Sequence, residues 1–450
     1  MADALKLSFA DEATVNRIAD LGAEPDWRRA ERHDALKRFL ELPVETNPLF
    51  TLYVDLRQAK LDQIEPYLET ADAAEVSTVV PEGAAALIEI ADGRVVARAL
   101  SNHAADAGVV IDTFANLFAT RPDLVALVRS ITDAGASLPL DDKFAQAARA
   151  FAAIGLLVHV PRDVVLDQPI VVRWAAGEPG RGLISRTVIS LGENAQAQIL
   201  EEQVASDAHS AEEDQQSLWW GTSEVSLGLG AHLSFAGQQD FGPNTVAIVN
   251  RHAALAQDAQ LRWALASVGA ALHKSRIDNR LVGRGSSVSQ VEIGFGSGRQ
   301  LFDLTSYTRH IGEDTTGDLL SKGVFLDRAR GYFKGMIDIE RSAKGTDSFL
   351  GEFAMLLAKQ ARSVTIPSLE IDQPDVRRAS HSSSVGPIDE DEIFYLMSRG
   401  IPREAARKFI VLGFLEPVVA RIPLADAQDR LRLLLERKWP QSAAPAQQAA

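Results

Sequence analysis

Residues 225–235 read Val-Ser-Leu-Gly-Leu-Gly-Ala-His-Leu-Ser-Phe, with an apolar residue at every second position. Since successive side chains of a strand point to opposite faces, this alternation predicts strands with one buried face. The stretch also contains a phrase that recurs along the chain: apolar residues, a Gly or acidic turn, a small residue, and then alternation again. Clear copies lie at 189–195, 225–231 and 282–288, and weaker ones at 254–259 and 357–361.

Repeats of short strands without helical segments between them predict the stacked coils of a β-solenoid. A β-sandwich contains similar short strands and stays as the structural alternative. The small residue after each turn, such as Ala195 or Ala231, marks the place where we expect a coil to bend tightly and stack on the next. The polar stretch from Glu201 to Gln216 is predicted to be a solvated loop between coils.

The patterns on either side of this region divide the chain further. Residues 1–150 are predicted to be mainly helical, with one hairpin signal at the Ala-Asp-Gly of residues 91–93. Residues 151–385 form the predicted β core. Residues 386–440 are predicted to be helical again, since Asp389 suits an N-cap and is followed by acidic residues that favour the positive end of a helix. The tail, 441–450, has too little apolar content to order itself.

Composition narrows the class of protein. Of 450 residues, 46% are hydrophobic and 24% charged, which is typical of a soluble globular protein. The net charge of −15 argues against binding to nucleic acid and against docking on an anionic membrane. The N-terminus lacks the pattern of a signal peptide, and no apolar run approaches the roughly 20 residues that span a bilayer. We therefore expect a cytoplasmic protein.

The chain contains no cysteine. This excludes disulfides, a zinc site of the cysteine type and an iron–sulfur cluster held by thiolates of this chain alone. It also contains no G-x-x-x-x-G-K-[ST] motif, so any ATP hydrolysis must belong to a partner.

The region after the core carries the most specific pattern. The chain reads Ser-His-Ser-Ser-Ser-Val-Gly-Pro-Ile-Asp over 380–389 and Phe-Tyr-Leu-Met-Ser-Arg-Gly-Ile over 394–401. These segments resemble the C-terminal signature of the SufB/SufD family, which belongs to the SUF iron–sulfur cluster assembly system. Further matches lie at 155–161, 167–170, 186–189, 201–202, 322–325 and 409–415, so the resemblance covers about residues 140–437. Within the family, the form of residues 384–389 is more similar to SufD than to SufB.

The resemblance implies a mainly β fold, with a right-handed parallel β-helix core flanked by helical N- and C-terminal regions. It also implies a complex of one SufB, one SufD and two SufC ATPase subunits. In such a complex the two β-helices associate, and the C-terminal helices hold SufC. The chain is then expected to be a non-catalytic scaffold that assists iron–sulfur cluster assembly and transfer. A homodimer in the absence of SufB stays an open alternative.

Two histidines match histidines of the family. His381 matches the one proposed to help hold iron or cluster at the SufB–SufD interface, and an imidazole can ligate iron beside cysteines of another chain. Many SufD proteins carry a cysteine two residues earlier, but here that residue is Ala379. We therefore expect no stable cluster on the isolated subunit, only a transient one in the complex. No flavin motif is readable, so binding of reduced flavin stays open. For His310 a structural hydrogen bond is predicted.

Apolar side chains on the C-terminal helices give the predicted docking surface for the SufC-type ABC ATPase. Its residues are Phe394, Leu396, Met397, Phe409 and Phe414. Two other functions stay as alternatives. A SufB-like subunit is disfavoured because SufB is expected to supply a cysteine, and a carbohydrate-active β-helix enzyme is disfavoured because such enzymes are commonly secreted.

Overall fold

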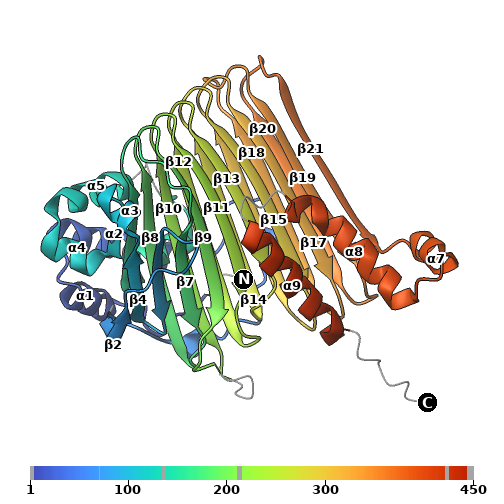
Figure 1. Ribbon diagram of the computed structural model, residues 1–450, viewed down its shortest axis with the longest axis horizontal. Helices are drawn as coiled ribbons and strands as arrows, with labels where there is room; N and C mark the ends of the chain where they lie inside the picture. The colour runs from blue at the N-terminus through green and yellow to red at the C-terminus, as the bar shows by residue number, and fades with distance from the viewer. Residues whose placement is uncertain (1–4, 70, 134–137, 210–214, 421–424, 443–450) are drawn as a thin grey trace.

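The computed structural model describes residues 5–69, 71–133, 138–209, 215–420 and 425–442. Its core consists of two long sheets whose strands are stacked along the molecule (Figure 1). The chain alternates between these sheets, and each strand pairs in parallel with the strand two further along the chain. This topology confirms the predicted parallel β-helix, and the β-sandwich alternative is wrong.

The strands of the coils are regular in length. Sheet A contains β6 (Ile154–Val160), β8 (Arg181–Leu191), β10 (Ser217–Leu227), β12 (Thr245–Leu255), β14 (Leu272–Leu281), β16 (Leu301–His310), β18 (Arg330–Ile339) and β20 (Arg362–Ile371). Sheet B contains β7 (Ile170–Ala176), β9 (Gln196–Ala205), β11 (His232–Asp240), β13 (Gln260–Ser267), β15 (Ser287–Gly296), β17 (Thr316–Phe325), β19 (Asp347–Leu356) and β21 (Arg378–Pro387).

The recurring sequence phrase lies at turns from sheet A to sheet B in the copies at 189–195, 225–231, 254–259 and 282–288. The weaker copy at 357–361 lies instead in the turn from β19 of sheet B to β20 of sheet A. Successive turns from sheet A to sheet B place one residue each in the left-handed region, where Gly, Asn and Asp are favoured: Asn194, Gly230, Asp258, Gly285, Asp314 and Gly345. The backbone N–H of each donates to a carbonyl of the next turn, as Asn194 does to Leu229 at 2.8 Å. The small residue that follows is fully buried in every case: Ala195, Ala231, Ala259, Ser286, Thr315 and Thr346. The turns therefore stack as predicted.

The N-terminal part combines helices with strands that extend the two sheets. Its helices are α1 (Glu12–Leu21), α2 (Asp26–Glu41), α3 (Asn102–Asp106), α4 (Phe114–Thr120), α5 (Pro122–Thr132) and α6 (Lys143–Phe151), with short 3-10 turns at Thr51–Tyr53 and Leu61–Gln63. Its strands are β1 (Glu65–Pro66), β2 (Ala71–Ser77), β3 (Ala86–Ala91), β4 (Arg94–Leu100) and β5 (Val110–Thr113). The predicted hairpin is confirmed as the antiparallel pair β3–β4. Because β3 pairs with β7 and β5 with β6, the sheets continue across residue 150.

Helices α2 and α6 pack on the outer face of sheet A. Phe39 and Phe144 share one buried cluster with Trp220 of β10, and the rings of Phe144 and Trp220 lie 5.6 Å apart. A buried guanidinium adds ion pairs to these contacts, since Arg186 of β8 donates to Glu224 of β10 and, at 2.9 Å, to Glu31 of α2. The N-terminal helices are thus fixed to the core by both apolar and ionic contacts.

The C-terminal part consists of α7 (Glu390–Ser398), α8 (Arg403–Val419) and α9 (Ala425–Ser442). The carboxylate of Asp389 accepts from the N–H of Asp391 at 2.8 Å, which confirms the predicted N-cap. Helices α8 and α9 lie along the outer face of sheet B, where Leu415 and Leu431 share a buried cluster with Phe295 (Figure 1). The predicted tail begins inside α9, which runs to Ser442, and residues 443–450 lie outside the described part.

Among the described residues, no helix is both long enough and apolar enough to cross a membrane.

Candidate functional site

The last coil leaves an open end. Strand β20 is the last strand of sheet A and pairs only with β18, while β21 is the last strand of sheet B and pairs only with β19, within the described residues. Each of these strands has ten residues, and their side chains are half-buried or exposed, whereas those of the preceding strands are mostly buried. An unpaired edge of this length is a template for pairing with another chain.

His381 lies on β21, on the coil that no further described strand covers. Its register partner on β19 is Leu350, which is buried inside the coil with Leu319 and Ile337. In-register residues of a parallel β-helix stack along its axis, so His381 continues an interior row and is exposed only because the row ends there. Ala379, two residues earlier on the same strand, is half-buried.

Among the described residues, the structure places no set of metal ligands around His381. In the described part of the molecule, no group of three or more His, Cys, Asp or Glu side chains is arranged to hold a metal ion. Further ligands for an ion at His381 would have to come from outside these residues, for example from a second chain. The open end of the coil is the place where such a chain can reach the imidazole.

Two buried carboxyl groups lie in the interior row beside that of His381. Glu292, Ser321, Glu352 and Ser383 are register partners on successive strands of sheet B. Burial raises the pKa of Glu292 to about 7 and that of Glu352 to about 8, and in Glu352 this outweighs the hydrogen bond that its carboxylate accepts from Ile366 N–H at 3.1 Å. This polar row leads through the core to the open end.

Sequence reasoning missed this row. Glu292 and Glu352 alternate with apolar residues, as solvent-facing positions also do, and only the coil geometry shows that their side chains point inward. The predicted loop from Glu201 to Gln216 is wrong in its first part for the same reason. Glu201 lies in β9, is buried, and accepts from Arg251 of β12.

The five predicted docking residues do not share one environment. Phe394, Met397 and Phe409 are exposed, with exposed fractions of 72%, 42% and 59%. Leu396 is half-buried in the cluster between the C-terminal helices and sheet B. Phe414 packs in that cluster too, and the amine of Lys322 lies 4.5 Å from the centre of its ring. The exposed apolar side chains of α7 and α8 are thus Phe394, Met397 and Phe409, together with Tyr395.

His310 has the structural role predicted for it. Its Nδ1 lies 2.8 Å from the hydroxyl of Thr315 and its Nε2 lies 3.1 Å from that of Ser348. Burial lowers the pKa of His310 to about 4, so the ring is neutral at physiological pH. The ring therefore links the turn that contains Thr315 to the next coil, which contains Ser348.

Comparison with known proteins agrees with this architecture. Residues 173–414 match the family described as SUF system FeS cluster assembly, SufBD core domain. An iron–sulfur cluster assembly SufBD family protein of Staphylococcus saprophyticus is 25% identical over 449 residues, an alignment that covers 94% of this chain and 92% of that protein. A SufBD family protein of Staphylococcus aureus is 25% identical over 450 residues, with the same coverage of both chains. Because the family match covers more than half of the chain, this β-helical protein belongs to the SufBD family of iron–sulfur cluster assembly proteins.

Proposed function

We propose that this chain is the SufD-type subunit of a SUF complex and acts as a non-catalytic scaffold in the cytoplasm. The observation that carries the proposal is the open end of the β-helix, where β20 and β21 have unpaired edges and His381 is exposed. A scaffold subunit needs a surface whose hydrogen bonds are satisfied only when a partner binds, and the unpaired edges at this end of the coil form such a surface. The absence of cysteine disfavours the SufB-like alternative.

The partner at this end would be a SufB paralogue. A second coil that adds its strands to the edges of β20 and β21 would satisfy their backbone N–H and C=O groups. It would also enclose His381 and could place cysteine thiolates beside the imidazole. The same edges could pair with a second copy of this chain when SufB is missing.

The second partner would be a SufC-type ATPase, docked on α7 and α8. Large apolar side chains that stay exposed on a helical surface are typical of interaction sites. Phe394 and Phe409 are the two most exposed of these side chains on the two helices. ATP-driven closure of a docked ATPase could then shift the arrangement of the paired scaffold subunits.

The isolated chain should be colourless and should hold no stable cluster. Without thiolates it offers iron only imidazole and carboxylate groups, whereas clusters of this kind are usually held by several cysteines. The measurement is anaerobic reconstitution with iron and sulfide, followed by visible absorption and iron analysis after desalting. A stable brown species with near-stoichiometric iron and sulfide would contradict the proposal.

The role of His381 can be tested in cells. We expect His381→Ala to leave the fold and the complex intact, because the side chain is exposed. Cluster production should fall when the SUF system is the only source, since one ligand at the proposed interface is lost. Ser382→Ala, on the same strand and also exposed, is the matched control. Wild-type cluster production by the His381→Ala complex would show that the imidazole has no part in assembly.

A further inference from the structure

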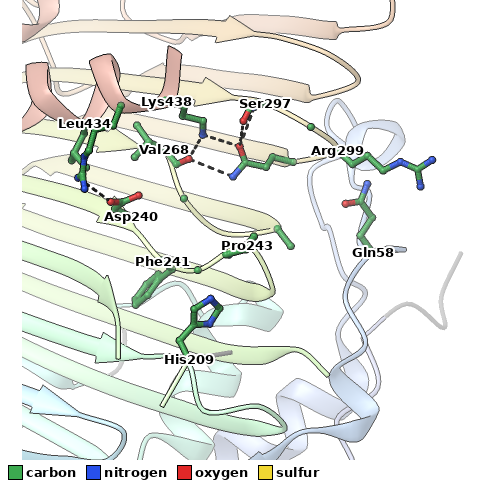
Figure 2. A pocket seen from close by; sticks show the side chains of 16 residues that line it. Gln58, His209, Asp240, Phe241, Pro243, Val268, Ser297, Arg299, Leu434 and Lys438 are labelled. Atoms are coloured by element: carbon green, nitrogen blue, oxygen red, sulfur yellow. Dashed lines mark hydrogen bonds and ion pairs between the residues drawn. The ribbon is translucent and has the colours of Figure 1, made fainter. Parts of the chain in front are cut away.

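A cavity of about 590 Å³ lies between the end of α9 and the turns that lead from sheet B to sheet A (Figure 2). The residues that line it are separated in the sequence from β20 and β21, the strands at the open end of the coil. Its walls come from three successive turns, at 240–243, 268–271 and 297–300, and from residues 434–438 of α9. Cavities of this size are typical of small-molecule sites.

The lining is basic although the protein is acidic. Arg299, Arg437 and Lys438 contribute three basic side chains, against one carboxylate, Asp240, and the chain as a whole has a net charge of −15. Arg437 lies 3.5 Å from Asp240. Arg299 lines the cavity and is exposed, and in Figure 2 its side chain extends away from Lys438 on the side where Gln58 lies. The remaining excess of positive charge favours an anion inside the cavity.

Lys438 is the most informative of these residues. Its amine is buried and donates to the carbonyl of Val268 and, at 2.7 Å, to Oε1 of Gln300. Gln300 is itself held by its amide, which donates to the carbonyl of Ala270 at 2.7 Å. An ammonium group has three N–H donors, so one is left after these two bonds. Burial lowers the pKa of Lys438 to about 7, and Asp240 only partly opposes this effect.

A buried amine is unfavourable unless a charge or hydrogen bonds compensate for it. Both acceptors of Lys438 are neutral groups, and its amine also lies 5.8 Å from the ring centres of Phe295 and Phe302. These cation–π contacts compensate part of its charge, but no carboxylate is among its hydrogen-bond partners. A bound anion would supply that missing charge and accept the third N–H. A role of Lys438 in fixing α9 to the turns would not by itself account for the cavity that it lines.

The opposite wall contains His209, for whose side chain two glycines leave room. The imidazole of His209 lies against Gly242, where any Cβ would come within 2.2 Å of the ring. Gly177 leaves room for the same side chain on its other side, since a Cβ there would lie 2.8 Å from that of His209. In Figure 2 the amine of Lys438 lies above the cavity and the imidazole of His209 below it.

We propose that this cavity binds a small molecule with a phosphate or carboxylate group, held by Lys438 and Arg299 and bordered by His209. The ligand would contact α9 and the sheet turns together, so its binding would fasten the last helix to the coil. This site is independent of the proposed scaffold function, because it lies on other residues than those assigned to the two partners.

The test uses the purified full-length chain, with inorganic phosphate and citrate as separate probes in calorimetric titrations. We expect at least one probe to bind at millimolar concentration or below and to slow hydrogen exchange in residues 425–442. Arg299→Gln should weaken binding about tenfold, as expected for loss of one charge-assisted hydrogen bond. Lys438→Met should weaken binding at least as much. Arg341→Gln, an exposed arginine in a turn between β18 and β19, should leave it unchanged.

Binding of phosphate alone would identify a phosphate-bearing ligand, and binding of citrate as well would extend the class to carboxylates. Lys438→Met could loosen α9, because it removes the hydrogen bonds of the lysine. If circular dichroism shows that Lys438→Met is unstable, the result for the exposed Arg299→Gln variant decides. The proposal is overturned if neither probe binds, or if binding occurs and Arg299→Gln does not weaken it relative to Arg341→Gln.

Discussion

Replacing Phe394 and Phe409 together by serine should weaken binding of the SufC-type ATPase by more than about 100-fold. Both rings are mostly exposed in the isolated chain, so their loss removes little packing within it. Burial of one such ring in an interface contributes roughly 1.5–3 kcal/mol, and aromatic residues are frequent among those that dominate interface energies. The measurement is the dissociation constant from surface plasmon resonance with the purified ATPase.

The matched control is Leu52→Ser. Leu52 is 77% exposed, but it lies in the N-terminal part, away from α7 and α8. Its replacement should change neither binding nor the melting temperature. Point variants are better suited than a truncation, because removal of α8 and α9 would uncover Ile293 and Phe295 on sheet B. Unchanged ATPase affinity of the folded double variant would place the docking site elsewhere.

The coil itself could be predicted because its turns favour particular residue types at adjacent positions of the sequence. A left-handed residue favours Gly, Asn or Asp, and a fully buried bend favours a small residue, so Asn194-Ala195 and Gly230-Ala231 can be recognised from the sequence. The N-cap at Asp389 and the β3–β4 hairpin were predicted for similar reasons. In each case the deciding interaction lies within a few residues of the chain.

Features that depend on contacts between residues far apart in the chain could not be predicted from the sequence. Glu201 and Arg251 are 50 positions apart and meet only because coils stack in register. Leu396 and Phe414 have the apolar character of a docking residue, but contacts with sheet B partly bury them. The exposure of a helix face depends on what the helix packs against, and periodicity gives no information on that. The basic cavity beside α9 is of the same kind, since its walls come from segments far apart in the chain.

The buried carboxyl of Glu352 should make the isolated chain less stable as the pH rises. Burial raises the pKa of Glu352 from its ordinary value of 4.5 to about 8, and the nearby carboxyl of Glu292 adds to this effect. Between these two values the folded state keeps a proton that the unfolded state releases. The free energy of unfolding therefore falls as the pH rises through this range, by at most about 1.4 kcal/mol per pH unit.

Glu352→Gln removes this proton and keeps an acceptor for the N–H of Ile366. The variant should be only slightly more stable than the wild type at about pH 5, and the difference should grow by about 2–3 kcal/mol at about pH 7.5. The measurement is urea unfolding of both chains at the two pH values. Glu370→Gln, an exposed carboxylate on β20, is the control and should show no such change. If the difference between variant and wild type is the same at both pH values, Glu352 is ionised in the folded chain, and the polar row inside the coil is more hydrated than its burial indicates.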